Sequence, residues 1–246
     1  MAVVERTIDI LGDETFTAVI LGKRMPAGYP VDIYDDDVTV LKTYALGYCS
    51  GIETVNFPNV EKVGTHAFLG CPNLKRVYFP AATTVNNGAL RDCPKMEEIN
   101  LPLAATVGDY AFLGDTSLKT ITLPSVTSCS TGIFFSCNAL EEAIMPKLKT
   151  VGGNTYYGCS AMKQIDLPSA TSIGGNVFVG CRQLEVINIG PNIKTIANTS
   201  FSSTPDGLVI NLPVAEGVIT GAPWGAPNAI INYEVPYSGK VPMPES

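Results

Sequence analysis

Residues 96–118 read MEEINLPLAATVGDYAFLGDTSL, and this pattern returns along the chain with a period of 22 residues. Six of the seven cysteines keep the period, and Asp115 stands where one more would fall. A fixed period in this range indicates a stacked repeat array. Function is therefore expected on the faces of a solenoid rather than in a pocket of a globular enzyme. The six periodic cysteines are Cys49, Cys71, Cys93, Cys137, Cys159 and Cys181.

Each coil begins with three apolar positions, which are Met96, Ile99 and Leu101 in the quoted stretch. The last two alternate with period two, and a proline follows them, which cannot donate to a β-ladder. This pattern predicts a short strand that the proline ends. A second apolar stub follows at Val107, and the off-period Cys129 is its counterpart one coil later. We therefore expect Cys129 to be a core residue and not a reactive thiol.

A Gly-rich turn and a large side chain, aromatic in most coils, complete the repeat. We expect these large side chains and the cysteines to have a structural role inside the coils. An odd number of cysteines at a repeat spacing favours reduced, buried thiols over disulfides, and no Cys-x-x-Cys pair indicates zinc. The large side chains are Phe68, Phe112, Phe134, Tyr156 and Phe178, with Leu46 and Leu90 as variants.

Composition excludes several classes of protein. The chain has 246 residues, of which 46% are hydrophobic and 16% charged, and this is ample for a folded core. Its formal charge of -7 and the absence of a Lys/Arg cluster argue against nucleic acid and anionic membranes as partners. Residues 1–11 lack the features of a secretory signal, and no apolar run is long enough for membrane insertion. These features indicate a cytosolic chain, a mature form, or release without a signal peptide.

The repeat also predicts the domain organisation. We expect an N-terminal cap at 1–32, a solenoid at 33–213, a C-terminal cap at 214–234 and a flexible tail at 235–246. The period slips by one residue at Gly190, after which the pattern continues with a spacing of 23. Caps are expected because an open solenoid leaves unpaired strand edges at both ends.

The repeat Leu-Pro-x-x-Thr-x-Val-Gly-x-x-Ala-Phe-x-Gly-Cys-x-x-Leu-x-x-Ile resembles the BspA-like (Treponema-type) class of leucine-rich repeats over roughly residues 35–213. The resemblance implies a right-handed leucine-rich-repeat superhelix with 22-residue coils and a parallel sheet on one face. Turns or short helical pieces would form the other face. It also implies a surface-exposed adhesion or recognition module. Residues 221–229, Gly-Ala-Pro-Trp-Gly-Ala-Pro-Asn-Ala, resemble repeat proteins encoded in prophages of gut bacteria.

The strand positions that face away from the core form the predicted binding face. Their side chains are polar and rich in hydroxyls and amides, which suits a cell-surface glycan or protein, and the alternative is a merely solvated sheet face. The predicted ligand-binding residues are Arg76, Tyr78, Glu98, Asn100, Thr120, Thr122, Glu142, Gln164 and Asp166.

Two further rows of side chains recur with the period. The first alternates in charge, and we expect it to fix register and solubility rather than to bind a ligand. The second is largely apolar and either packs under the turns or forms an exposed stripe. Oligomerisation through this stripe or through the caps is a further alternative. The charged row is Glu53, Lys75, Glu97, Lys119, Glu141, Lys163 and Glu185. The apolar row is Leu69, Arg91, Leu113, Phe135, Tyr157 and Val179.

The sequence shows no catalytic constellation. His66 is the single histidine, and no nucleophile elbow, phosphate loop or zinc-protease motif occurs. The acidic run at 35–37 lacks the spacing of a calcium loop. We therefore expect no enzyme, cofactor or metal site. The sequence predicts a recognition or adhesion module, including phage virion or tail-associated host attachment. A bacterial adhesin for host tissue and an intracellular interaction scaffold are the alternatives.

Overall fold

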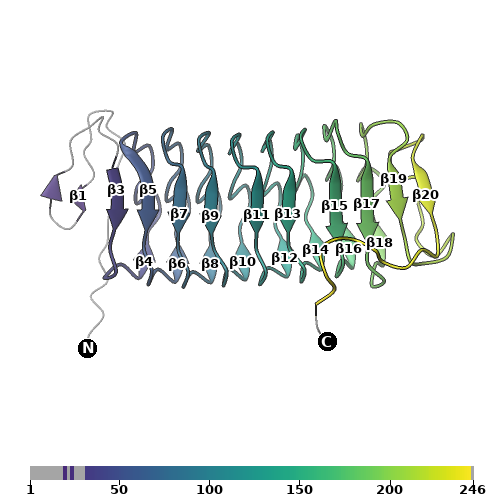
Figure 1. The fold of residues 1–246 in the computed structure, drawn as a ribbon, viewed down its shortest axis with the longest axis horizontal. Helices are drawn as coiled ribbons and strands as arrows, with labels where there is room; N and C mark the ends of the chain where they lie inside the picture. Colours follow the sequence, from purple (N-terminus) through teal and green to yellow (C-terminus); the bar gives the residue numbers. More distant parts are fainter. Residues whose placement is uncertain (1–18, 21–22, 25–30, 245–246) are drawn as a thin grey trace.

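The computed structural model describes residues 19–20, 23–24 and 31–244, and in these ranges its coils stack into one elongated solenoid (Figure 1). All regular secondary structure in the described ranges is β-strand, and turns join the strands. No helix in the described part of the chain is long and apolar enough to cross a membrane. The fold class predicted from the 22-residue period, a leucine-rich-repeat solenoid, is confirmed.

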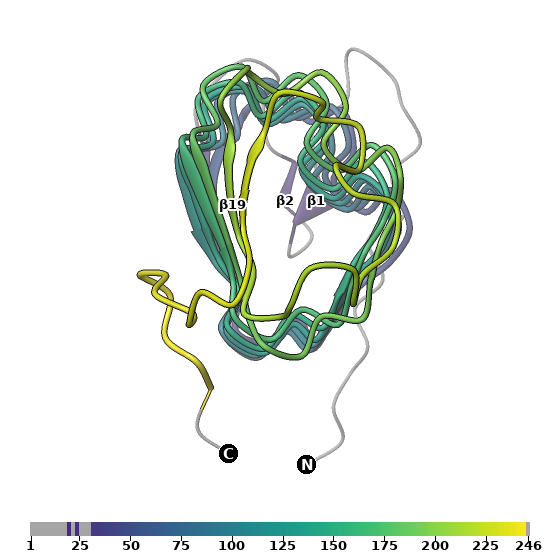
Figure 2. The same ribbon diagram turned by 90° about the vertical axis from the view of Figure 1, so that its right-hand side faces the viewer.

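The longer strands of the coils lie side by side along one wall of the solenoid and are called the long-strand sheet (Figures 1 and 2). All its pairs are parallel, and hydrogen bonding divides it into the segments β3-β5-β7-β9, β11-β13 and β15-β17-β19-β20. The strands are β3 (Val31–Tyr34), β5 (Ile52–Asn56), β7 (Arg76–Tyr78), β9 (Glu98–Asn100), β11 (Thr120–Thr122), β13 (Glu142–Ile144), β15 (Gln164–Leu167), β17 (Val186–Ile189), β19 (Val209–Asn211) and β20 (Ile230–Asn232).

The apolar stubs form a second parallel sheet of eight strands, the short-strand sheet, on the opposite wall (Figure 2). Sequence analysis recognised these stubs as core positions but did not predict that they pair. The strands are β4 (Val40–Leu41), β6 (Lys62–Val63), β8 (Thr84–Val85), β10 (Thr106–Val107), β12 (Ser128–Cys129), β14 (Thr150–Val151), β16 (Ser172–Ile173) and β18 (Thr195–Ile196). Two further strands, β1 (Val19–Ile20) and β2 (Lys23–Arg24), form an antiparallel pair.

The register of both sheets follows the repeat, including the change of spacing from 22 to 23 residues at Gly190. Val85 pairs with Val107 at the 22-residue spacing, whereas Ile173 pairs with Ile196 at the 23-residue spacing. Gly190 lies where the spacing changes, and a Cβ at this position would overlap the carbonyl oxygen of Pro168 in the coil before it. Glycine therefore lets two successive coils approach closely at the slip.

A column of aromatic rings fills the interior between the two sheets. Phe112 and Phe134 are fully buried, and their ring centroids lie 5.5 Å apart with the rings nearly parallel. The column continues through Tyr156, Phe178 and Phe201 with similar stacking. Stacked rings of this kind add packing energy beyond the apolar area that they bury. The leucine variants Leu46 and Leu90 are also fully buried.

The cysteines form a second buried column. All seven are buried and free, including the off-period Cys129. Five of the thiols donate to a backbone carbonyl oxygen of the preceding coil, as Cys137 does to Phe112 over 3.0 Å. Burial raises the pKa of the Cys137 thiol well above its usual value, so the thiol keeps the proton that it donates.

Both ends of the ladder extend into the segments predicted as caps. At the N-terminal end, β3 begins at Val31, and the rest of the predicted 1–32 cap lies outside the described residues apart from β1 and β2. At the C-terminal end, β20 pairs with β19. Trp224 is fully buried there, edge-on to Phe201, and its indole N–H donates to the Thr220 carbonyl. After β20 the chain turns back along the outside of the long-strand sheet (Figures 1 and 2).

Candidate binding face

The outer face of the long-strand sheet carries the predicted binding residues. In β7 the buried Val77 separates Arg76 and Tyr78, which point outward, and the same alternation recurs in β9 and β11. Parallel pairing sets equivalent residues opposite one another, so that Tyr78 lies opposite Asn100. The nine predicted side chains therefore lie in two rows across the strands. The first row is Arg76, Glu98, Thr120, Glu142 and Gln164, and the second is Tyr78, Asn100, Thr122 and Asp166.

The N-terminal half of this face, from β3 to β11, is open to solvent. Tyr78 donates its hydroxyl to the Glu98 carboxylate over 2.9 Å, and this hydrogen bond raises the pKa of Tyr78. The Arg76 guanidinium donates to the Thr54 hydroxyl over 3.1 Å. These contacts hold side chains of neighbouring strands in place while leaving them accessible.

Tyr34 belongs to the same face and was missed by the sequence analysis. It is 60% exposed and pairs with Asn56, which pairs in turn with Tyr78. Tyr34 lies 22 residues before Asn56, so the repeat period alone places it in the second row. The predicted binding residues of this row began at Tyr78, so both Tyr34 and Asn56 were left out. The row therefore starts with two tyrosines that alternate with two asparagines.

The C-terminal half of the second row is closed by its own hydrogen bonds. The side-chain amide of Asn188 donates to Oδ1 of Asp166 over 2.8 Å. Asn211 donates to Asn188 over 2.8 Å, and Asn232 donates to Asn211 over 2.9 Å. This asparagine ladder, Asp166 to Asn232, ties β15, β17, β19 and β20 together through their side chains. Each amide of the ladder is thus engaged with its neighbour, although Asn211 and Asn232 stay partly exposed.

The C-terminal segment then covers Asp166. The backbone N–H groups of Lys240 and Val241 donate to Oδ2 of Asp166 over 2.6 and 3.1 Å. Tyr237 closes a turn in the segment by donating its hydroxyl to the Val241 carbonyl, and burial, followed by the nearby Asp166 charge, raises the pKa of this hydroxyl. Asp166 is consequently buried, although it was predicted to contact a ligand. We call residues 235–244 the strap, where sequence analysis expected a loose extension.

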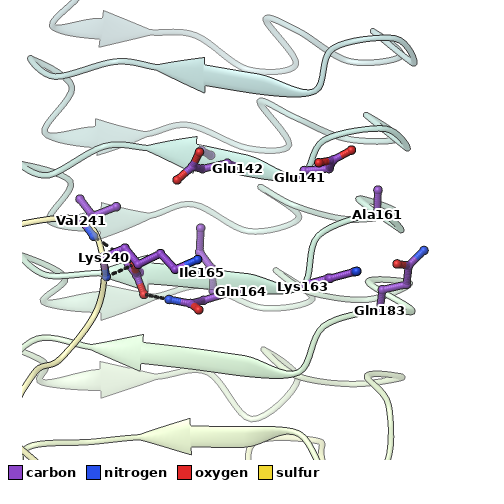
Figure 3. Close-up of a pocket in the computed structure, with 11 residues that line it drawn as sticks. Glu141, Glu142, Ala161, Lys163, Gln164, Ile165, Gln183, Lys240 and Val241 are labelled. Carbon is purple, nitrogen blue, oxygen red and sulfur yellow. Dashed lines mark hydrogen bonds between the residues drawn. The ribbon is translucent and has the colours of Figure 1, made fainter.

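A polar groove of about 480 Å³ runs between β13, β15 and the strap. In Figure 3, Glu142 lies on one side of it, and Gln164 and Lys240 lie on the other. The Gln164 amide donates to Oδ1 of Asp166 over 2.9 Å, so Gln164 supports the seat of the strap. Of the predicted ligand-binding residues, Glu142, Gln164 and Asp166 thus belong to the groove and the strap, and the other six belong to the open half.

The charged row runs along the edge of the same sheet. Lys75 and Glu53 form a salt bridge of 2.9 Å, with about a third of each side chain exposed. The backbone N–H of Lys75 also donates to the Glu53 carbonyl, which fixes the two residues on adjacent coils. The remaining members from Glu97 to Glu185 are exposed, and the alternation sets each of them beside opposite charges.

The apolar row lies at the turns and is half-buried. Phe135 and Tyr157 stack face to face in this row, with centroids 4.5 Å apart and an angle of 3° between the rings. The rings of Tyr110 and Phe135 lie edge to face, with centroids 6.3 Å apart. The row therefore packs against itself across coils, and this contact uses part of its apolar surface.

His66 has a structural environment. It adopts a left-handed conformation with φ of 55°, at a turn position that Gly88 fills in the next coil. A Cβ on Gly88 would overlap the imidazole, so the ring covers this glycine, and Tyr110 covers Gly132 in the same way. Burial, with a smaller effect from Arg91, lowers the pKa of His66. Its one ring contact in the described chain is Tyr44, at 5.0 Å.

The acidic run at 35–37 is partly internal. The Asp35 carboxylate is buried and accepts a hydrogen bond from the backbone N–H of Asp37 over 2.9 Å, which is a turn contact. Across the described ranges, no three His, Cys, Asp or Glu side chains are grouped closely enough to hold a metal ion.

The stacked strands, buried cysteine column and open sheet face define a leucine-rich-repeat solenoid. The family model described as the BspA type leucine-rich repeat region, with six copies, matches residues 31–106 and 83–206. These matches span well over half of the sequence, and the chain belongs to this family. No curated protein sequence matches the chain significantly.

Solved structures with similar folds include bacterial leucine-rich repeat proteins. The T. pallidum leucine-rich repeat protein is 20% identical over 76% of this chain and 82% of its own, with a TM-score of 0.52. A leucine-rich repeat protein from Bacteroides ovatus is 17% identical over 82% of this chain and 70% of its own, with a TM-score of 0.42. The pneumococcal vaccine antigen PcpA is 14% identical over 94% of this chain and 84% of its own, with a TM-score of 0.37. At these identities the likeness concerns the fold alone.

Proposed function

We propose that this protein is a non-enzymatic recognition module of the adhesion type. In this proposal it binds a glycan or protein on a cell surface through the outer face of the long-strand sheet. The observation that carries the proposal is the open half of that face, where Arg76 and Tyr78 of β7 and Asn100 of the neighbouring β9 direct polar groups outward. These side chains offer an aromatic ring surface together with hydrogen-bond donors and acceptors to a ligand. A rigid ladder presents them at low entropic cost.

Membership of the BspA-type family supports a binding role over catalysis, because solenoids of this kind typically present extended surfaces to partners. Association with a phage particle, which residues 221–229 suggest, is a narrower proposal. The Trp224 of this motif closes the aromatic column at the end of the solenoid. Since packing explains the tryptophan, the motif does not favour a virion over a bacterial surface or an intracellular scaffold.

Binding of labelled protein to intact gut-type bacterial cells and to epithelial cells tests the proposal. The double variant Tyr78→Ala with Asn100→Ala should lose most of the binding. A matched control, Thr106→Ala with Thr150→Ala, changes two exposed residues of the short-strand sheet and should bind as the wild type does. The cell type that binds distinguishes host attachment from adhesion to tissue. Failure to bind either cell type would contradict the proposal and favour an intracellular scaffold.

A further inference from the structure

We propose that the open half of the sheet face is a site for an uncharged glycan chain, which lies across the strands along the row Tyr34, Asn56, Tyr78 and Asn100. We call these four residues the tyrosine–asparagine row. The inference rests on the proposed recognition function and assigns its location and ligand class. It follows from four features of the face: the position of the strap, the free amides, the spacing of the rings and the balance of charge.

The strap limits where a long ligand can lie. Lys240 and Val241 cover Asp166. Beyond Asp166, the side-chain amides of Asn188, Asn211 and Asn232 are hydrogen-bonded within the asparagine ladder. A ligand at this end would have to displace the strap and break the ladder. No such contact covers the face between β3 and β11 in the described structure, and Figure 1 shows the strap confined to the C-terminal end of the sheet.

The same residue type behaves differently at the two ends of the row. Asn188, Asn211 and Asn232 lie on adjacent strands, and each side-chain amide donates a hydrogen bond to the preceding member of the ladder. Tyr78 separates Asn56 from Asn100, so these two amides cannot join in a ladder, and neither makes a side-chain hydrogen bond within the described residues. Each presents two donors and an acceptor to solvent. A hydroxyl-rich ligand can use all of them.

The two tyrosines supply ring surfaces at a suitable repeat. They lie two strands apart, which is about 10 Å at the spacing of paired strands. A sugar ring offers a face of C–H groups and a rim of hydroxyls. The C–H face can pack on the electron-rich face of a tyrosine, while the rim reaches the amides between the rings. A chain of sugars along the row would therefore meet rings and amides alternately.

Charge favours a neutral glycan over an acidic one. The outward strand positions from β3 to β11, together with the adjacent members of the charged row, carry four acidic and three basic residues. The balance provides no net positive field, which a sulfated or sialylated chain would require. These residues are Asp32, Glu53, Lys75, Arg76, Glu97, Glu98 and Lys119.

The outward residues of the open half also disfavour a protein ligand. Interfaces between proteins bury an apolar centre that is depleted of charge. From Asp32 in β3 to Thr122 in β11, the strand positions that are not buried hold no Leu, Ile, Val, Met or Phe. They are Asp32, Tyr34, Glu53, Thr54, Asn56, Arg76, Tyr78, Glu98, Asn100, Thr120 and Thr122. A glycan therefore fits this face better than a protein does.

The test measures binding of the full chain to immobilised uncharged glycans built from hexoses and N-acetylhexosamines, beside sulfated and sialylated glycans. Tyr34→Ala and Tyr78→Ala should each weaken binding about tenfold or more. Tyr78→Phe keeps the ring and should retain most of the affinity. Tyr48→Ala is the matched control, because Tyr48 is 61% exposed but lies at a turn outside the face. It should bind as the wild type does.

The outcomes separate this inference from the proposed function. Binding to an uncharged glycan that Tyr34→Ala and Tyr78→Ala weaken, and Tyr48→Ala does not, supports both. Binding only to acidic glycans overturns the ligand class. Cell binding that Tyr78→Ala abolishes, without binding to any glycan, overturns the glycan and leaves recognition through the face, with a protein as ligand. Glycan binding that is equal in all four variants overturns the location.

Discussion

Oδ1 of Asp115 accepts a hydrogen bond from the backbone N–H of Cys93 over 3.0 Å, and Oδ2 of the same carboxyl has no hydrogen-bond partner among the described residues. Asp115 is fully buried in the cysteine column, where the other coils place a thiol. Burial raises the pKa of its carboxyl well above the usual value, and the bond from Cys93 only partly opposes this effect. A carboxyl at this point is a local defect in an otherwise apolar column.

Replacing Asp115 with cysteine should stabilise the protein, by roughly 1–3 kcal/mol at neutral pH, because it removes an unsatisfied buried polar group. The gain should grow with pH. An unfolded chain ionises this carboxyl near its usual pKa of 3.8, whereas the folded protein holds the proton. Stability from this group is therefore complete below that pH and falls as the pH rises toward the folded pKa. Melting temperatures of variant and wild type at pH 4 and pH 8 measure the difference.

The reciprocal change, Cys137→Asp, provides the control for this prediction. It sets a second carboxyl in the column one coil later, at a fully buried position, and should lower the melting temperature more at pH 8 than at pH 4. A wild type and an Asp115→Cys variant that melt together at pH 8 would contradict the account of Asp115 as a buried acid.

Phe112→Ala should cost about 3–5 kcal/mol, as is usual for truncation of a buried aromatic residue. The ring stacks on Phe134 and is fully buried, so the substitution leaves a void that both sheets border. Denaturant unfolding followed by circular dichroism measures the loss. Phe135→Ala is the matched control, because Phe135 is only half-buried at the turns, and it should cost clearly less. Equal costs would show that the column is not the centre of the core.

The charged row predicts a graded response to charge reversal. Lys75→Glu breaks the salt bridge to Glu53 and sets three like charges in succession, whereas Lys119→Glu does the latter alone. Each neighbouring pair of this kind contributes roughly 0.2–1 kcal/mol, so Lys75→Glu should lower the melting temperature more. High salt should reduce the loss of melting temperature in both variants, because it screens the charges. Thermal melts at low and high ionic strength measure them, and a salt-independent loss would point to a cause other than charge.

Gly239→Ala should release the strap. A Cβ at this position would overlap the Tyr237 hydroxyl and lie 2.7 Å from the Asp166 carboxylate, within the turn that seats the strap. The amides of Lys240 and Val241 should then exchange their hydrogens quickly, whereas in the wild type their bonds to Asp166 protect them. Ser238→Ala changes an exposed neighbour and should leave the protection intact. Slow exchange in the glycine variant would argue against the described seat.

The periodic part of the structure could be read from the sequence, because equivalent residues in a solenoid occupy equivalent places. The 22-residue spacing predicted a short strand around Ile99, which the structure has as β9, and the slip at Gly190 appears in the structure as a 23-residue register between paired strands. Cys129 lies in the core position that its valine counterparts indicated. For these residues one coil is a template for all others.

Contacts that do not recur from coil to coil leave no pattern in the sequence from which they could be predicted. Lys240 contacts Asp166 across 74 residues, and among the described residues no other coil has an equivalent contact. The same pattern that placed Asp166 on an exposed face therefore could not show that the strap covers it. The pairing of the short strands was missed for another reason, since a two-residue segment such as Thr150–Val151, with one exposed and one buried residue, is too short to show strand alternation. Tyr34 was missed because the predicted binding residues of its row began at Tyr78, although Tyr34 lies within the predicted solenoid, 33–213, and on the same 22-residue period.

The alternation of Glu and Lys between neighbouring coils has a consequence for how an array of this kind can change in length. Loss or gain of one coil would keep the hydrogen-bonded register but bring like charges together at the new junction, as Glu53 beside Glu97. It would also set Tyr110 and His66, which each cover a glycine of the next coil, against a different neighbour. A pair of coils is therefore the smallest cassette whose duplication or deletion preserves both patterns. Recombination between alternate coils would be better tolerated than recombination between adjacent ones.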